Sequence, residues 1–280
     1  MRTRAIDPAY HHVYDSLDEF LSAEEYPRGI LTVRHGGIPI DVRNNVRGHD
    51  TVMVFFHAAI TKPNARLPMF TGTGISKNVR ADRIFIADPS LYIDDGLNLS
   101  WYAGNYAQPD LQDVIAQILT ALISPGRPVV TFGASGGGFA AMHFAARIPG
   151  ALAVPVNPQV DLARYNSAPV KRWLRLGWGL DPETARLTDV PAETDSGRAY
   201  REGDMTRVWY VQNTGDANHM DNHFGPFMDS LPARHRISPV LIDGGAGHVP
   251  PPKESLTTLL SAAVQGAERP PSREQLTVSA

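Results

Sequence analysis

The sequence predicts an α/β protein with a mostly parallel central sheet, flanked by helices and carrying a small helical cap insertion. Two observations support this fold class. Six short runs rich in β-branched and aromatic residues recur along the chain, and each is almost continuously apolar, as in strands that are covered on both faces. Helical patterns separate several of these runs, and such alternation is typical of parallel sheets.

The elements follow in chain order. Residues 30–33 and 38–42 are expected to pair as an antiparallel hairpin, because Gly36 and Gly37 between them supply the positive φ angles of a tight turn. Helices are expected at 111–123, where apolar residues recur at helical spacing, and at 137–147. The remaining strands are expected at 52–56, 83–87, 128–132, 151–156, 207–211 and 239–243.

One main domain accounts for most of the chain. Residues 30–264 carry the alternating pattern, preceded by an N-terminal extension at 1–29. Residues 161–205 interrupt the pattern for longer than a simple connection needs, and VKRWLRLGWGL within them predicts an amphipathic helix. We interpret 161–205 as the cap insertion. Residues 265–280 are polar and contain prolines, which predicts a flexible C-terminal tail.

Composition excludes several classes of function. The formal net charge is -3 and no run of Lys and Arg exceeds two residues, so the chain lacks the basic surface that nucleic acid requires. It contains no cysteine, which excludes disulfides, thiolate metal sites and a cysteine nucleophile. Neither a signal-peptide pattern nor an apolar run of membrane-spanning length is present, so a cytoplasmic location is expected.

A glycine cluster carries the first catalytic signal. Gly133-Ala134-Ser135-Gly136-Gly137 matches the G-x-S-x-G pattern and lies between an expected buried strand and an expected helix. In that context the glycines allow a turn that lifts the serine hydroxyl above the sheet, with the free N–H groups of the helix beside it. The pattern therefore predicts that Ser135 is a nucleophile.

A serine nucleophile needs a histidine base, which a carboxylate orients. His248 lies in the loop after the last expected strand and is the predicted base. Asp216, in the loop after the preceding strand, is the preferred acid. Asp221 and Asp161 remain alternatives, since each also follows a strand, and any of the three could instead cap a helix.

With these residues in this order, the chain resembles the α/β-hydrolase superfamily, in particular its serine esterases, over about residues 30–252. The resemblance implies an oxyanion hole formed by the N–H of Gly136 and by a second N–H, from Ala58 or Ala59, in the loop that follows the strand at 52–56. The family commonly has His-Gly where this chain has His57-Ala58. Candidate substrate contacts are His57, Trp101, Tyr102 and, in the cap, Trp173.

Metal and cofactor chemistry are not expected. His219 and His223 could share a helix face near Asp216 and Asp221, but the segment lacks the glutamate of the H-E-x-x-H zinc motif. No glycine run matches a dinucleotide or phosphate loop.

The sequence therefore predicts a serine hydrolase that cleaves a carboxylic ester, small or glycan-linked, through an acyl-enzyme. An acyltransferase or deacylase acting on a glycan-like acceptor or substrate would use the same residues and stays open. A non-catalytic binding protein is the third alternative.

Overall fold

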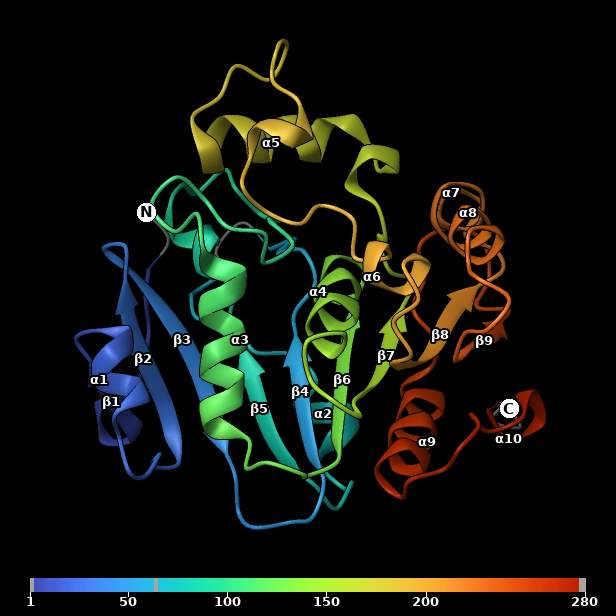
Figure 1. Ribbon diagram of the computed structural model, residues 1–280, viewed down its shortest axis with the longest axis horizontal. Coiled ribbons are helices and arrows are strands. Elements are labelled where there is room, and N and C mark those ends of the chain that lie inside the picture. Colours follow the sequence, from blue (N-terminus) through green and yellow to red (C-terminus); the bar gives the residue numbers. More distant parts are fainter. Residues whose placement is uncertain (1–2, 63–64, 277–280) are drawn as a thin grey trace.

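The computed structural model describes residues 3–62 and 65–276. Within them, nine strands form a single sheet in the order β1-β2-β3-β5-β4-β6-β7-β8-β9 (Figure 1). From β5 across to β9 neighbouring strands are parallel, whereas β3 is antiparallel to both of its neighbours. The strands are β1 His11–Tyr14, β2 Gly29–His35, β3 Ile38–Asn45, β4 Val52–Phe56, β5 Asp82–Ile86, β6 Val129–Ala134, β7 Leu152–Val156, β8 Arg207–Asn213 and β9 Ile237–Ile242.

The hairpin is confirmed. β2 and β3 pair antiparallel, and the turn between them places Gly36 and Gly37 at φ values of 57° and 76°. The sequence analysis missed β1, which pairs in parallel with β2 at the edge of the sheet. Its two central residues, His12 and Val13, are both exposed, so it lacks the apolar run by which the buried strands were found.

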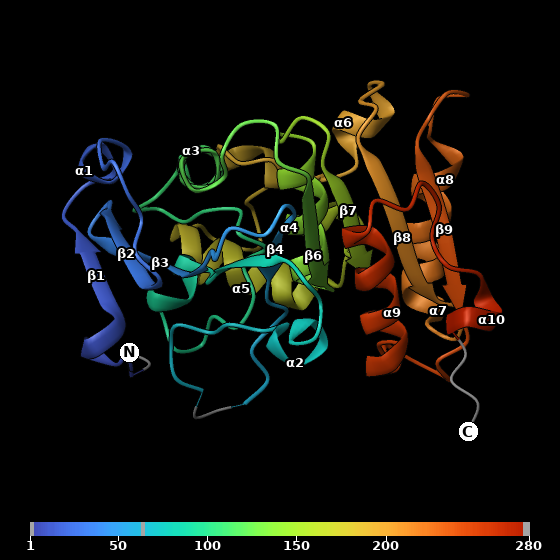
Figure 2. The same ribbon diagram turned by 90° about the horizontal axis from the view of Figure 1, so that it is seen from below.

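Alternate residues of the central strands face two separate cores. Val52, Val54 and Phe56 of β4 face the core that is covered by α3 (Leu111–Leu122) and α4 (Gly136–Ala145). Met53 and Phe55 face the opposite core, which α9 (Lys253–Val264) covers. Figures 1 and 2 show these helices on the two sides of the sheet. Because every residue of β4 is buried, its sequence is apolar throughout.

A third core lies over the carboxyl ends of the parallel strands. Here α5 (Ser167–Trp178) crosses above the ends of β4 and β6 (Figure 1). Val170, Trp173 and Leu174 of α5 are buried, while its basic residues point outward. They pack with Trp101 and other apolar residues of the loop after β5. The amphipathic helix expected in the insertion therefore closes the molecule above this edge of the sheet.

The remaining helices are short. The segment after β8 consists of α7 and α8 joined by the π-helical residues Met220–Phe224. At the C-terminal end, Leu276 of α10 is buried in the core under α9, and its carbonyl accepts a hydrogen bond from Ser255 Oγ (2.6 Å). None of the described helices is both long and apolar enough to cross a bilayer. The short helices are α1 Leu17–Leu21, α2 Thr73–Ser76, α6 Arg198–Arg201, α7 Ala217–His219, α8 Gly225–Asp229 and α10 Arg273–Leu276.

Candidate active site

Ser135 occupies the sharp turn between β6 and α4. Its φ and ψ angles are 54° and -119°, a backbone conformation that residues other than glycine rarely adopt. The flanking glycines allow the close approach of strand and helix: a Cβ on Gly133 would lie 2.0 Å from the carbonyl oxygen of Gly137, and one on Gly137 would lie 2.4 Å from that of Phe56. The glycine cluster therefore builds the strand–turn–helix context in which the G-x-S-x-G pattern has chemical meaning.

A buried glutamine holds the Ser135 hydroxyl. Gln159 Nε2 donates to Ser135 Oγ at 2.7 Å, and Trp101 Nε1 donates to Gln159 Oε1 at 2.6 Å. Because an indole N–H can only donate, the atom of Gln159 that faces it must be the oxygen, and the amide NH₂ must face the serine. Ser135 Oγ thus accepts from Gln159, so its own proton is directed to another acceptor.

Asp216 and His248 come together at the same edge of the sheet. His248 Nδ1 lies 2.6 Å from Asp216 Oδ2, and the Asp216 side chain is buried whereas that of His248 is 42% exposed. The other two candidate acids lie elsewhere: Asp221 is exposed, and Asp161 caps a short 3₁₀ helix by accepting from the N–H of Ala163. Asp216 is thus the acid that contacts the histidine, while the hydrogen bond of Ser135 Oγ is made to Gln159.

The electrostatics fix the state of this pair. Burial opposes ionisation of Asp216, but the hydrogen bonds from His248 and from the N–H of His219 outweigh it, so the pKa of Asp216 lies below its usual value. An ionised carboxylate can only accept, and therefore His248 carries its proton on Nδ1. In the neutral form of the ring, Nε2 is then the nitrogen that can accept a proton.

Asn213, the last residue of β8, positions the loop that carries His248. Its Oδ1 accepts from the N–H groups of Gly215 and Gly244, and its Nδ2 donates to the carbonyls of Gly245 and Gly247. One buried amide thereby joins the Asp216 loop to the His248 loop. Its own N–H donates to Asn157 Oδ1 at 2.7 Å, which ties this arrangement to the end of β7.

Two further histidines lie against the pair. The His219 ring stacks on that of His248 with a centroid distance of 4.2 Å, and His223 lies 5.1 Å beyond it. Burial lowers the pKa of His219 to about 4 and that of His223 to about 3, so both are neutral at neutral pH. His219 Nδ1 is 3.0 Å from Asp216 Oδ2, but off the direction of a hydrogen bond.

Asp216, His219 and His248 also present ligand-type atoms within 4.8 Å of one another. The hydrogen bond between His248 and Asp216 already accounts for the closest of these approaches.

The expected oxyanion loop follows β4 directly. The N–H of His57 donates to Tyr102 Oη at 2.7 Å and is thus occupied. Within the described parts of the chain, no acceptor is paired with the N–H groups of Ala58, Ala59 or Gly136. The His57 ring is buried and connects two loops. Its Nδ1 contacts the carbonyl of Ala58, and its Nε2 accepts from the N–H of Asp88, after β5. Burial lowers the pKa of His57.

The expected substrate contacts lie deep in the protein. Tyr102 is 1% exposed and donates its hydroxyl proton to the carbonyl of Ile86. Trp173 is fully buried in the cap core, where its Nε1 donates to the carbonyl of Gly104. Trp101 reaches Ser135 only through Gln159. His57 and these three aromatic residues are therefore all buried.

The sequence analysis missed Gln159, Asn213 and Asn157. These residues belong to no short motif. Each nevertheless lies at or just after the carboxyl end of β7 or β8. Polar residues at these ends of parallel strands converge on the site of an open α/β sheet, which was the signal that could have identified them.

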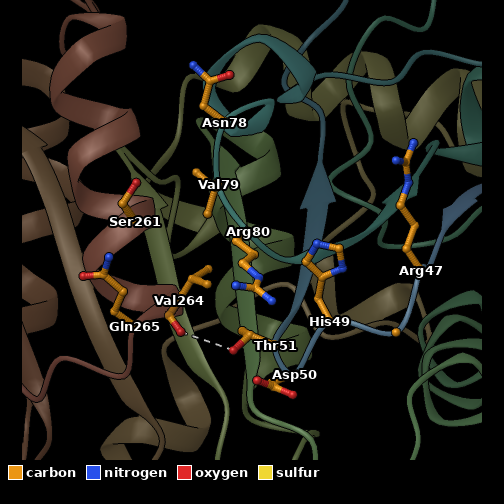
Figure 3. Close-up of a pocket in the computed structure, with 11 residues that line it drawn as sticks. Arg47, His49, Asp50, Thr51, Asn78, Val79, Arg80, Ser261, Val264 and Gln265 are labelled. Atoms are coloured by element: carbon orange, nitrogen blue, oxygen red, sulfur yellow. Dashed lines mark hydrogen bonds between the residues drawn. The ribbon is translucent and has the colours of Figure 1, made fainter.

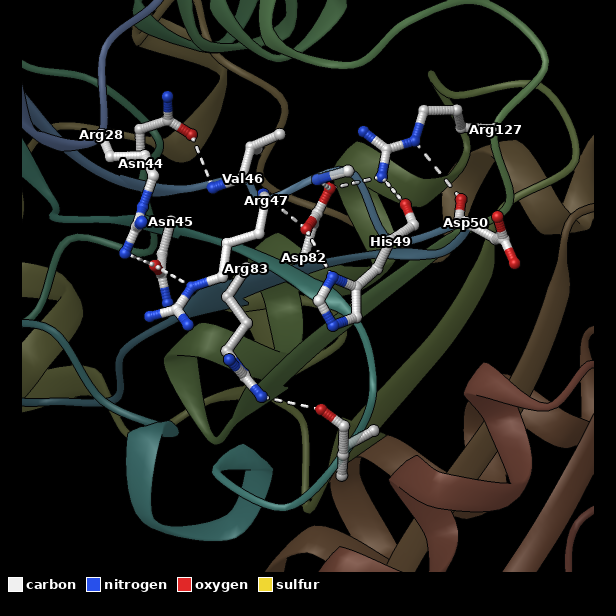
Figure 4. Close-up of polar contacts among 12 residues, drawn as sticks. Arg28, Asn44, Asn45, Val46, Arg47, His49, Asp50, Asp82, Arg83 and Arg127 are labelled. Atoms are coloured by element: carbon white, nitrogen blue, oxygen red, sulfur yellow. Dashed lines mark hydrogen bonds and ion pairs between the residues drawn. The ribbon is translucent and has the colours of Figure 1, made fainter.

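A cavity of about 660 Å³ lies at the opposite edge of the sheet. Residues before β4 and β5 and at the end of α9 line it, among them His49, Arg80 and Gln265 (Figure 3). Both carboxylate oxygens of Asp82, beside the cavity, already have partners. The carboxylate pairs with Arg127 and accepts from the N–H groups of Arg47 and Gly48 (Figure 4). This network joins the strands and is remote from Ser135.

Comparison of the sequence with family models and with curated proteins finds no match. Solved structures are similar in fold. The capsule O-acetyltransferase of Neisseria meningitidis serogroup A matches with a TM-score of 0.58 at 14% identity, over 88% of this chain and 96% of that one. Mycobacterium tuberculosis MPT51 matches with a TM-score of 0.54 at 15% identity, over 88% of this chain and 98% of that one. The 2,6-dihydroxy-pseudo-oxynicotine hydrolase matches with a TM-score of 0.54 at 15% identity, over 88% of this chain and 71% of that one.

At these identities the likeness concerns the fold alone. The strand order, the glycine-flanked turn after β6 and the similarity in fold to a solved hydrolase agree with one another. The chain is a protein of the α/β-hydrolase fold.

Proposed function

We propose that this protein is a serine hydrolase that cleaves a carboxylic ester through an acyl-enzyme. The observation that carries the proposal is the 2.6 Å contact between His248 Nδ1 and Asp216 Oδ2, at the same edge of the sheet as Ser135 on its strained turn. A serine, a histidine and a carboxylate are the groups that acyl transfer by serine requires, and the chain order serine, carboxylate, histidine is the one typical of this fold.

In the proposed reaction, Ser135 Oγ attacks the acyl carbon while its proton passes to His248 Nε2. The oxyanion accepts hydrogen bonds from the N–H of Gly136 and from that of Ala58 or Ala59. Collapse of the tetrahedral intermediate breaks the bond to the alkoxide, which leaves with the proton from His248. Water then attacks the acyl carbon of the acyl-enzyme and gives a proton to His248 Nε2. The bond to Ser135 Oγ breaks, Ser135 takes the proton back from His248, and the carboxylic acid is released. Asp216 holds the imidazole in the required tautomer and stabilises the imidazolium.

Hydrolysis of 4-nitrophenyl acetate tests the proposal. We expect purified protein to release 4-nitrophenolate, and Ser135→Ala and His248→Ala to lower kcat/KM by about 10⁴-fold or more. A fluorophosphonate should add once to the wild type, by intact mass, and not to Ser135→Ala. Ester cleavage that persists in folded Ser135→Ala would exclude Ser135 as the nucleophile.

Acyl transfer is the second candidate. The observation that favours it is the N. meningitidis capsule O-acetyltransferase, which is similar in fold over 96% of its length, and a variant of which has been solved with CoA. Here an acceptor hydroxyl would replace water in the second half of the reaction. Because this chain has no cysteine, a thiol reagent reports CoA release without background. Release of CoA from acetyl-CoA that rises with an added oligosaccharide would indicate a transferase, whereas ester cleavage indifferent to acceptor would indicate a hydrolase.

A further inference from the structure

The space beside Gly136 is filled by three side chains. A Cβ added to Gly136 would lie 2.3 Å from Leu99 Cδ1, 3.3 Å from Trp101 Cδ1 and 3.5 Å from Gln159 Oε1. All three side chains are buried. We call Leu99, Trp101 and Gln159 the acyl wall, because all three lie beside Gly136, the first proposed oxyanion donor, and Gln159 also contacts Ser135 Oγ.

The acyl wall is held firmly in place. Trp101 and Gln159 are fully buried and joined by the 2.6 Å hydrogen bond, and Gln159 is also fixed to Ser135. The Trp101 ring packs edge-on against Trp173 of α5 and against Tyr165, with centroid distances of 5.8 and 5.9 Å. Close-packed interiors give way little to an added methylene, so an entering chain cannot push these groups aside without loss of their contacts.

This location bears on the acyl group because of the geometry of the proposed intermediate. When the carbonyl oxygen is bound by the N–H of Gly136 and the carbonyl carbon is bonded to Ser135 Oγ, the first carbon of the acyl chain must lie within a few ångströms of Gly136. A longer acyl chain placed on the Cα side of Gly136 would meet the acyl wall there.

We propose that the acyl wall restricts this site to very short acyl groups, with acetyl esters as the substrate class. This inference rests on the proposed function, since it concerns the acyl group carried by Ser135. Leu99 is the determinant that can be changed most cleanly. It makes the closest approach to Gly136, whereas Trp101 and Gln159 also hold Ser135.

The experiment measures kcat/KM for 4-nitrophenyl acetate, butanoate and hexanoate on wild type, Leu99→Ala, Leu99→Val and Leu97→Ala. Leu97 is the matched control: it comes from the same loop and the same core, but its Cδ2 faces Gly177 of α5. We expect wild type to prefer acetate over butanoate by about 10-fold or more, and Leu99→Ala to raise the ratio of butanoate to acetate by a similar factor. Leu97→Ala should leave the ratio as in wild type.

The outcomes separate this inference from the proposed function. Ser135-dependent cleavage of all three esters at similar rates in the wild type would overturn the acetyl preference and leave the hydrolase proposal standing. A strict acetate preference that Leu99→Ala and Leu99→Val leave unchanged would exclude the acyl wall as its cause. Failure to cleave any ester, with no adduct on Ser135, would instead count against the proposed function. If Leu99→Ala does not fold, the wild-type series and Leu99→Val still give the answer.

Discussion

Ser135 has an unfavourable backbone conformation, and the proposed reaction depends on its hydroxyl group. At φ 54° and ψ -119° its Cβ is crowded by the backbone, a conformation that costs of the order of 1–3 kcal/mol in a residue other than glycine. The surrounding structure maintains this conformation through the N–H of Ser135, which donates to the carbonyl of Val156 (2.9 Å), and through Gln159 at its hydroxyl. Stability is thus given up at the residue on which the proposed chemistry depends.

This strain predicts a difference between two inactive variants. Ser135→Ala and Ser135→Gly both lose the hydroxyl and its bond to Gln159, but only glycine relieves the crowding at Cβ. We expect the free energy of unfolding of Ser135→Gly to exceed that of Ser135→Ala by about 1 kcal/mol, measured by urea denaturation. Equal stabilities would mean that the turn is not strained in the folded protein.

The choice among the three candidate acids gives a second prediction at this scale. Asp216→Asn should lower kcat by about 10⁴-fold, because the amide would leave His248 in the wrong tautomer for a base. Asp221→Asn, at an exposed position five residues further along, is the matched control and should remain close to wild type. A large loss in Asp221→Asn with activity retained in Asp216→Asn would reverse the assignment. The same ester assay measures both.

At the scale of the elements, the carboxyl ends of four parallel strands supply the candidate site. β4 leads into Ala58 and Ala59, β6 into Ser135, β8 into Asp216 and β9 into the loop of His248. Parallel pairing brings these ends to one edge of the sheet, where ligands bind in open α/β folds. Asn213 then joins the last two loops through four hydrogen bonds to four glycines.

Asn213→Ala should therefore affect rate more than binding. Without the amide, the loop of His248 loses three hydrogen bonds to the end of β8. A displacement of about 1 Å at the imidazole can cost about 10²-fold in rate. We expect kcat to fall by this order with KM nearly unchanged, as measured with 4-nitrophenyl acetate. Asn222→Ala removes an amide that donates to the carbonyl of Asn218 on the surface, and it should behave as wild type. A rise in KM at constant kcat would point to a substrate contact instead.

At the scale of the whole molecule, buried neutral histidines make stability depend on pH. Burial lowers the pKa of His143 and His223 to about 3 and that of His219 to about 4. In the unfolded chain these groups titrate near about 6.5. Between those values the unfolded state binds more protons than the folded state. Stability from this source is therefore complete above about pH 6.5 and falls as the pH decreases toward 4.

Each such histidine should contribute a slope of about 1.4 kcal/mol per pH unit below its unfolded pKa. Urea denaturation between pH 7.5 and pH 5, read as free energy of unfolding, measures the total. His143→Phe, in a core next to Phe139 and Phe144, should reduce the slope by one histidine's share. An unchanged slope in His143→Phe would mean that this ring is protonated in the folded state.

The sequence by itself determined the layers of this protein and the motif at its centre. Continuous apolar runs reveal strands buried on both faces, and the glycines around Ser135 reveal a turn, because both are local consequences of burial and backbone sterics. The order of the strands also made His248 and Asp216 the leading candidates. The edge strand β1 escaped because an exposed strand has no such local pattern.

Only the tertiary structure decided which acid meets His248 and what surrounds Ser135. Asp216, Asp221 and Asp161 each follow an expected strand, and their places in the folded chain decide which of them contacts His248. Gln159, Asn213 and His219 act through contacts with residues tens of positions away in the chain, or across a loop, and no short-range pattern encodes such contacts. Long-range packing sets the environment of each polar group, and for this reason the acyl wall and the support of His248 could be seen only in the folded molecule.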